Sequence, residues 1–149
     1  MHDIKSFLKS INFDDENNLL NDVTIEKVVL NKKSETFSVY LKSENVLPYD
    51  IIDKLINGSY LINGEYKCNI YISYVNITDE DLLEYVKIIM EKLVEKKPSL
   101  ISLLESIPVI DDDIIIFEVI SITEEENIKK EEANIRKILA SYGFRDYLI

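Results

Sequence analysis

A chain of 149 residues with 46% hydrophobic and 30% charged residues has a globular composition, and it can form one domain or two small ones. Its 17 basic residues against 28 acidic ones give a formal net charge of −11, which repels phosphate backbones and disfavours general nucleic-acid binding. A single cysteine excludes an internal disulfide, and no apolar run suits a signal peptide or a membrane span, so we expect a cytoplasmic protein that spans no membrane.

The first elements predicted along the chain are a short helix and a β-hairpin. The helix over residues 4–11 follows from apolar residues at helical spacing. Residues 23–30 and 35–42 are rich in β-branched and aromatic residues, and their alternation predicts that Phe37, Val39 and Leu41 face the core. Between them, Asn31 and Ser34 suit a tight turn because their short side chains hydrogen-bond locally and tolerate unusual backbone angles.

A second helix and a third strand complete the first half. Pro48 suits a first helical position, and Gly58 can close this helix, although comparison of lengths with the family named below lets it continue to about Leu61. Residues 66–75 alternate so that Cys68, Ile70 and Ile72 share one face, with Tyr71 and Val75 on the other. The predicted order is therefore αββαβ.

The second half predicts two helices, a hairpin and a final helix. Thr78 can cap the first, and Pro98 ends it or begins the second. Residues 108–122 suggest a hairpin with three aspartates in its turn, and its second strand is apolar on both faces, so we expect it to be central or covered. Thr123 and Glu126 have capping-box spacing, and Gly143 stops the last helix.

The predicted fold class is α+β, as two small mixed units of order αββαβ and ααββα. No repeat or Gly/Ser linker divides the chain. The polar stretch around residue 76 favours a boundary there, with a first unit over 1–76 and a second over 77–149.

Three acidic stretches invite a metal site, and each has a simpler interpretation. Asp111-Asp112-Asp113 lies in a turn without a neighbouring base or Lys, so a solvated turn is favoured over metal-dependent phosphoryl transfer. Residues 14–17 lack the glycine and the later glutamate of a calcium loop. His2-Asp3, which contains the only histidine, sits at the chain end. We therefore expect no metal and no catalytic residues.

Other chemistry has little support in the sequence. Cys68 at an alternating strand position favours a buried structural cysteine over a nucleophile. The three glycines fit no phosphate-binding loop, so no cofactor is expected. The αββαβ order is like that of a KH domain, but the GXXG loop that clamps single strands is missing. Strand tyrosines could stack on bases, yet they more often pack as cross-strand pairs.

Several residue groups, in order, resemble the N-terminal region of the PolC-type DNA polymerase III alpha subunit of low-GC bacteria. They are Ile25–Val29, Lys32-Lys33-Ser34, Phe37, Leu47-Pro48-Tyr49, Tyr85, Pro98–Leu104, Ile114–Ile116 and Tyr142-Gly143-Phe144. Departures are Phe37, where the family often carries Trp, a shorter stretch between residues 58 and 66, and the Asp-rich second turn.

The resemblance implies a non-catalytic segment ahead of an OB-fold, a PHP domain interrupted by a 3′–5′ exonuclease, and the polymerase core. It also implies that the first unit is a truncated KH-like fold, similar to the polymerase-binding domain of the clamp-loader tau subunit. A protein–protein contact role in the replisome follows as the first hypothesis. A weak single-stranded nucleic-acid-binding domain is the alternative, and a free-standing enzyme is the third.

Candidate contact residues lie on the predicted hairpin surface. They are Lys32, Lys33, Tyr40 and Lys42. The two turn lysines form a positive spot that could pair with an acidic partner. The partner class is replisome proteins, with weak or no nucleic-acid binding.

Overall fold

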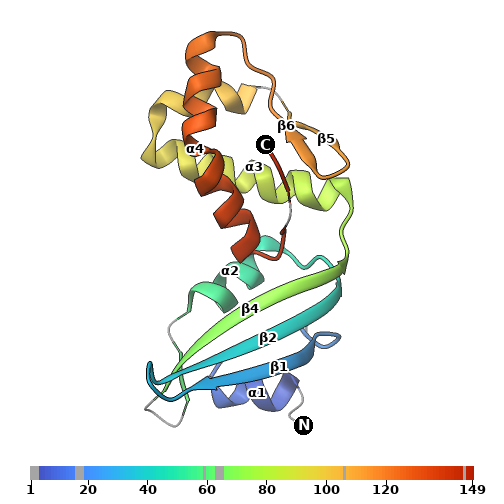
Figure 1. Ribbon diagram of the computed structural model, residues 1–149. Helices are drawn as coiled ribbons and strands as arrows, with labels where there is room; N and C mark the ends of the chain where they lie inside the picture. Colours follow the sequence, from blue (N-terminus) through green and yellow to red (C-terminus); the bar gives the residue numbers. More distant parts are fainter. Residues whose placement is uncertain (1–3, 16–18, 59, 63–65, 106, 146) are drawn as a thin grey trace. The chain divides into compact units, whose positions relative to one another are not determined.

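The chain packs as two compact units, Met1–Asn76 (unit 1) and Ile77–Ile149 (unit 2) (Figure 1). The computed structural model describes residues 4–15, 19–58, 60–62, 66–105, 107–145 and 147–149. Each unit combines helices with a β-sheet, so the predicted α+β class is confirmed.

Unit 1 is a four-stranded sheet with two helices. The strand order is β1-β2-β4-β3, in which β1 and β3 run antiparallel to their neighbours while β2 and β4 are parallel. A parallel pair needs a crossover connection, and the segment between β2 and β4 supplies it. The elements are α1 (Ile4–Ser10), β1 (Thr24–Asn31), β2 (Thr36–Asn45), α2 (Tyr49–Asn57), β3 (Tyr60–Ile62) and β4 (Tyr66–Asn76).

The short strand β3 is absent from the predicted αββαβ order. The possible extension of the second helix to Leu61 is wrong, because α2 ends at Asn57 and Gly58 already has an extended ψ of 150°. Glycine is suited to this position because an added Cβ would lie 2.3 Å from the Tyr60 ring. The Tyr60 hydroxyl donates to the Lys54 carbonyl at 2.8 Å, which holds the start of β3 against α2.

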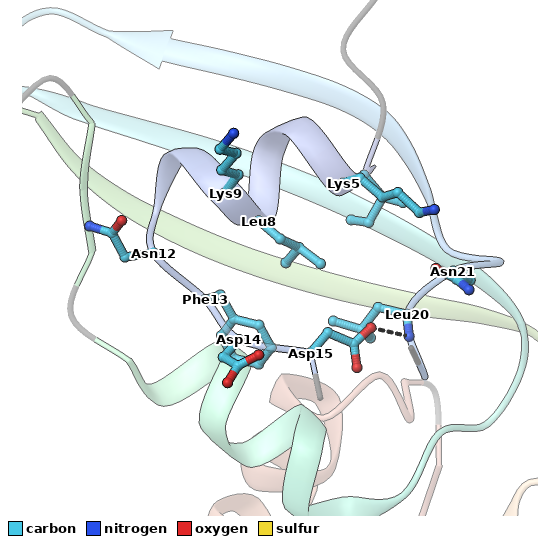
Figure 2. A pocket seen from close by; sticks show the side chains of 10 residues that line it. Lys5, Leu8, Lys9, Asn12, Phe13, Asp14, Asp15, Leu20 and Asn21 are labelled. Carbon is cyan, nitrogen blue, oxygen red and sulfur yellow. Dashed lines mark hydrogen bonds between the residues drawn. The ribbon is translucent and has the colours of Figure 1, made fainter. Parts of the chain in front are cut away.

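The inner face of the unit 1 sheet carries the predicted apolar residues. Val39 and Leu41 are each 1% exposed, and Cys68, Ile70 and Ile72 are buried beside them, as the alternation predicted. Both helices lie on this face (Figures 1 and 2). They bury Ile4, Phe7, Leu8, Tyr49, Ile52 and Leu55. Phe37 is only half-buried, because it lies near the hairpin end of β2, where its ring meets Tyr66 edge-on.

Unit 2 consists of α3 (Asp79–Lys96), the 3₁₀ helix η1 (Pro98–Glu105), the hairpin β5 (Val109–Asp111) and β6 (Ile114–Ile116), and α4 (Ile122–Ser141) (Figure 1). The predicted cap is confirmed at Thr78, whose hydroxyl accepts the Asp81 N–H at 3.1 Å. Gly143 has φ 100°, a conformation that glycine adopts readily, and it follows the end of α4 as predicted.

Two predictions for unit 2 are wrong. The N-cap of α4 is Ser121 and not Thr123: the Ser121 hydroxyl accepts the Glu124 N–H at 3.1 Å, and the Glu124 carboxylate accepts the Ile120 N–H at 2.7 Å. The apolar strand β6 is not covered on both faces, because Ile115 is fully buried while Ile114 and Ile116 are exposed.

The core of unit 2 joins its helices through aromatic rings, and an ion pair whose lysine side chain is 49% exposed links them as well. The Tyr85 ring of α3 lies 4.7 Å from the Phe144 ring, which follows α4. Lys97, just after α3, forms an ion pair with Glu131 of α4, and the Glu131 side chain is only 10% exposed. No helix in the described part of the chain is long and apolar enough to cross a membrane.

Candidate functional site

The outer face of the unit 1 sheet, opposite α1 and α2, carries a stack of one cation and two aromatic rings. The strand register places Tyr40 between Lys27 of β1 and Tyr71 of β4. The Lys27 ammonium lies 4.5 Å from the centre of the Tyr40 ring. The Tyr40 and Tyr71 rings stack at 5.0 Å with an interplanar angle of 19°. This cation–π and ring contact fixes the three side chains relative to one another.

The turn between β1 and β2 holds its two lysines outward. Asn31 caps the turn with its side-chain oxygen, which accepts the backbone N–H groups of Lys33 at 3.1 Å and Ser34 at 3.2 Å. The local hydrogen bonding predicted for Asn31 is confirmed, and the residue with the unusual backbone angle is Glu35, at φ 55°. Because the turn uses the Asn31 side chain and not the lysines, Lys32 and Lys33 are exposed.

The outer face and the turn bring the four predicted contact residues onto one hairpin but not into one cluster. Tyr40 and Lys42 are two residues apart on β2 and therefore share the outer face. Lys32 and Lys33 lie in the turn beyond Thr36, which is itself four strand positions or about 13 Å from Tyr40. Lys67, opposite Thr36 in the register, adds a further exposed lysine near the turn.

None of these lysines forms an ion pair with a residue that the structure describes. We define the basic–aromatic face as two adjoining parts: the outer-face residues Lys27, Tyr40, Lys42, Lys67 and Tyr71, and the turn residues Lys32 and Lys33. Lys27 and Lys67 were not among the predicted contact residues. Finding them requires the strand register, which includes an irregularity between Ile25 and Lys27 that local alternation does not reveal.

A cavity of about 510 Å³ lies beside α1 in unit 1 (Figure 2). Its described lining mixes apolar residues with Lys5, Lys9, Asn12, Asp14, Asp15 and Asn21. The Asp15 carboxylate is occupied, because its two oxygens accept the N–H groups of Leu19 at 2.9 Å and Leu20 at 2.8 Å. These two bonds give the Asp15 carboxylate a structural role, in which it holds the backbone of residues 19–20.

The other reactive residues are placed as follows. Cys68 is 2% exposed, as predicted for a structural cysteine, and burial raises the pKa of its thiol to about 11. Asp112 and Asp113 form the β5–β6 turn, while Asp111 ends β5. Within the described residues, no three or more His, Cys, Asp or Glu gather in a way that could hold a metal. The predictions on His2, Asp3, Glu16 and Asn17 fall outside the described residues.

Comparison with known families relates unit 1 to one class of protein. Residues 3–58 match the family model described as DNA polymerase III polC-type N-terminus I. For this part of the chain, the predicted resemblance to the N-terminal region of the PolC-type polymerase is confirmed.

The match does not extend to unit 2, whose resemblance to the same polymerase stays a prediction. No curated protein and no solved structure matches the chain. The KH-like fold of unit 1 also stays a prediction.

Proposed function

We propose that this chain is a non-catalytic interaction module of a PolC-type replicative DNA polymerase, and that it contacts an acidic surface of another replisome protein. The family match over residues 3–58 supports the link to DNA replication. The basic–aromatic face supports the contact role, and it is the observation that carries the proposal. In a chain of net charge −11, this face carries five exposed lysines, with Glu35 and Glu44 as exposed acidic neighbours.

The chemistry of this face suits an acidic protein surface. Lys32 and Lys33 are held outward by the Asn31 turn and can pair with carboxylates without changing the fold. Tyrosine side chains provide contact area at low entropic cost, and Tyr71 is 39% exposed. A rim of lysines beside an aromatic pair is a common composition for a contact that is steered by charge.

The alternative function is single-stranded nucleic-acid binding. The same tyrosines and lysines favour it, but the packing of the two tyrosine rings leaves few ring faces on which a base could stack. A base stacks on a free ring face. Tyr40 has Lys27 over its ring and Tyr71 stacked beside it, so both faces of the Tyr40 ring are occupied. The ring face of Tyr71 that points away from Tyr40 is the remaining platform of this stack. The net charge adds repulsion, so we expect only weak binding.

The contact role is tested by affinity capture from a lysate of the source organism, with captured proteins identified by mass spectrometry. Wild type should retain replisome proteins, and Lys32→Glu/Lys33→Glu should retain several-fold less. The matched control is Lys87→Glu/Lys130→Glu, which makes the same charge change at exposed residues of unit 2 and should behave as wild type. Equal capture of the same replisome proteins by all three chains would reject a contact through the turn.

Titration of a labelled single-stranded oligonucleotide at low salt tests the alternative. The proposal predicts weak binding that changes little in Tyr71→Ala. Tight binding that falls steeply with added salt, and that Tyr71→Ala weakens, would favour the nucleic-acid function instead.

A further inference from the structure

Three neighbouring backbone segments of unit 2 expose a continuous apolar surface. Val109 of β5 lies opposite Ile116 of β6, and Ile114 of β6 bridges to Leu148 near the C-terminus. Residues opposite each other in a ladder share a face, and so do residues two apart on a strand. These four side chains, which we call the apolar strip, are therefore on one face. Their exposed fractions are 60% for Val109, 46% for Ile116, 39% for Ile114 and 42% for Leu148.

The apolar strip belongs to a formed structure. Its reverse face carries Ile115, which is fully buried. The C-terminal segment is bonded beside β6, since the Ile115 N–H donates to the Leu148 carbonyl at 2.8 Å and the Leu148 N–H donates to the Asp113 carbonyl at 2.8 Å (Figure 1). A partner would therefore meet a surface whose backbone is already ordered, which lowers the entropic cost of binding.

The stretch of sequence that contains the β5–β6 hairpin is uniformly acidic. Every charged residue from Pro98 through Ile128 is Asp or Glu. They are Glu105, Asp111, Asp112, Asp113, Glu118, Glu124, Glu125 and Glu126. Asp111 lies directly opposite Ile114, at the edge of the strip itself. The C-terminal segment differs, since Arg145 lies three positions before Leu148 and the Arg136 Nε donates to the Tyr147 carbonyl at 2.9 Å.

This charge pattern decides between possible occupants. Two copies meeting strip to strip would bring their Asp-rich turns together, and like charges across an interface are unfavourable. Nucleic acid and anionic membranes are repelled for the same reason. A segment with apolar residues on one side and Lys or Arg on the other meets both properties of the surface.

We propose that the apolar strip of unit 2 docks a cationic amphipathic segment of another protein. Apolar side chains of the segment cover Val109, Ile114, Ile116 and Leu148, and its Lys or Arg residues pair with Asp111, Asp112 and Asp113. This surface is separate from the basic–aromatic face of unit 1 and selects a partner of the opposite charge. The proposal does not depend on the contact proposed for unit 1.

The test uses the full 149-residue chain and a fluorescently labelled helical peptide of about 18 residues, with Leu on one face and Lys on the other. Wild type should bind it, as measured by fluorescence anisotropy. Val109→Thr/Ile116→Thr keeps β-branched side chains but lowers their hydrophobicity, and should weaken binding about tenfold. Asp112→Asn/Asp113→Asn should weaken it severalfold and reduce its dependence on salt. Asparagine tolerates the positive φ of Asp112, so this variant preserves the turn.

Two controls separate docking from general effects. Val75→Thr changes an exposed strand residue of unit 1 and should bind as wild type. A peptide with Glu in place of every Lys should not bind. Equal binding of the Lys peptide by all variants would overturn the proposal, and so would a concentration-dependent dimer of wild type that Val109→Thr/Ile116→Thr abolishes.

Discussion

The two units build their inner sheet faces alike and their outer faces differently. In unit 1, Val39 and Leu41 are buried against the helices, while the reverse face carries lysines and stacked tyrosines. In unit 2, Ile115 is buried, while the reverse face carries the apolar strip beside aspartates. Burial on one face stabilises each fold. The outer face is free to vary, and its contrast in charge and polarity is the basis of the two separate contacts proposed above.

The largest expected effect is on the free energy of unfolding, which should fall far more for substitutions on the inner sheet faces than on the outer ones. Leu41→Ala in unit 1 and Ile115→Ala in unit 2 remove fully buried side chains, and each should lower the free energy of unfolding of its own unit by about 3 kcal/mol. Urea unfolding followed by a probe in each unit measures this. Lys42→Ala and Ile116→Ala, at exposed neighbours, should each cost less than about 1 kcal/mol. Equal losses at inner and outer positions would contradict the assignment of faces.

The next effect concerns Glu131, a buried carboxylate of unit 2. The Lys97 hydrogen bond, together with one from Asn134, holds the pKa of Glu131 below its ordinary value. A lowered folded-state pKa stabilises the protein above the ordinary carboxyl pKa, and this contribution is lost as pH falls through the lowered value. Lys97→Met should therefore destabilise unit 2 by about 1–2 kcal/mol at neutral pH, and the difference from wild type should shrink in acid.

Thermal unfolding of both chains between pH 7 and pH 3 measures this. Lys129→Met is the control at an exposed ion pair. It breaks the pair with Glu125, in which the Lys129 side chain is 68% exposed and the Glu125 side chain 49%, and it should have a smaller effect. A pH-independent loss in Lys97→Met would mean that the lysine acts only through packing.

A smaller effect is expected at the end of α4. Gly143→Ala places a Cβ at φ 100°, and it should cost about 1 kcal/mol of unit 2 stability. Gly143→Asn should recover part of this loss because Asn tolerates left-handed angles better than Ala. Chemical unfolding of wild type, Gly143→Ala and Gly143→Asn measures the three free energies of unfolding. Equal stability of wild type and Gly143→Ala would contradict the prediction.

The smallest effect tests the stack on the outer face of unit 1. Lys27→Met keeps the length of the side chain but removes the charge over the Tyr40 ring, so it should cost about 0.5 kcal/mol. A double-mutant cycle with Tyr40→Leu isolates the pairwise term. A coupling energy of zero would show that the contact contributes nothing to stability.

Much of the fold could be predicted because its signals are local. Alternation in β2 and β4 identified the buried side chains, and Thr78 and Gly143 marked helix ends through their own backbone chemistry. The strand β3 was missed because three residues beside a glycine carry too little periodicity to be distinguished from the end of a helix.

The outer faces could be predicted only in part. Tyr40 and Lys42 follow from alternation, but Lys27 and Lys67 join them through pairing with distant strands. The apolar composition of β6 predicted that it would be covered. The prediction was wrong because, among the described residues, β6 pairs with β5 and with a single C-terminal bridge at Leu148, so its outer face stays exposed. Long-range pairing, which decides what covers a strand, is not visible in a local pattern.

The most direct test measures both faces in one crosswise binding experiment. Labelled acidic peptide of alternating Glu and Tyr, and the Lys/Leu peptide, are each titrated with wild type, Lys32→Glu/Lys33→Glu and Val109→Thr/Ile116→Thr. We predict that the turn variant loses only the acidic peptide and that the strip variant loses only the basic one. If either variant weakens both peptides equally, or neither, the two faces are not separate binding surfaces and the account is contradicted.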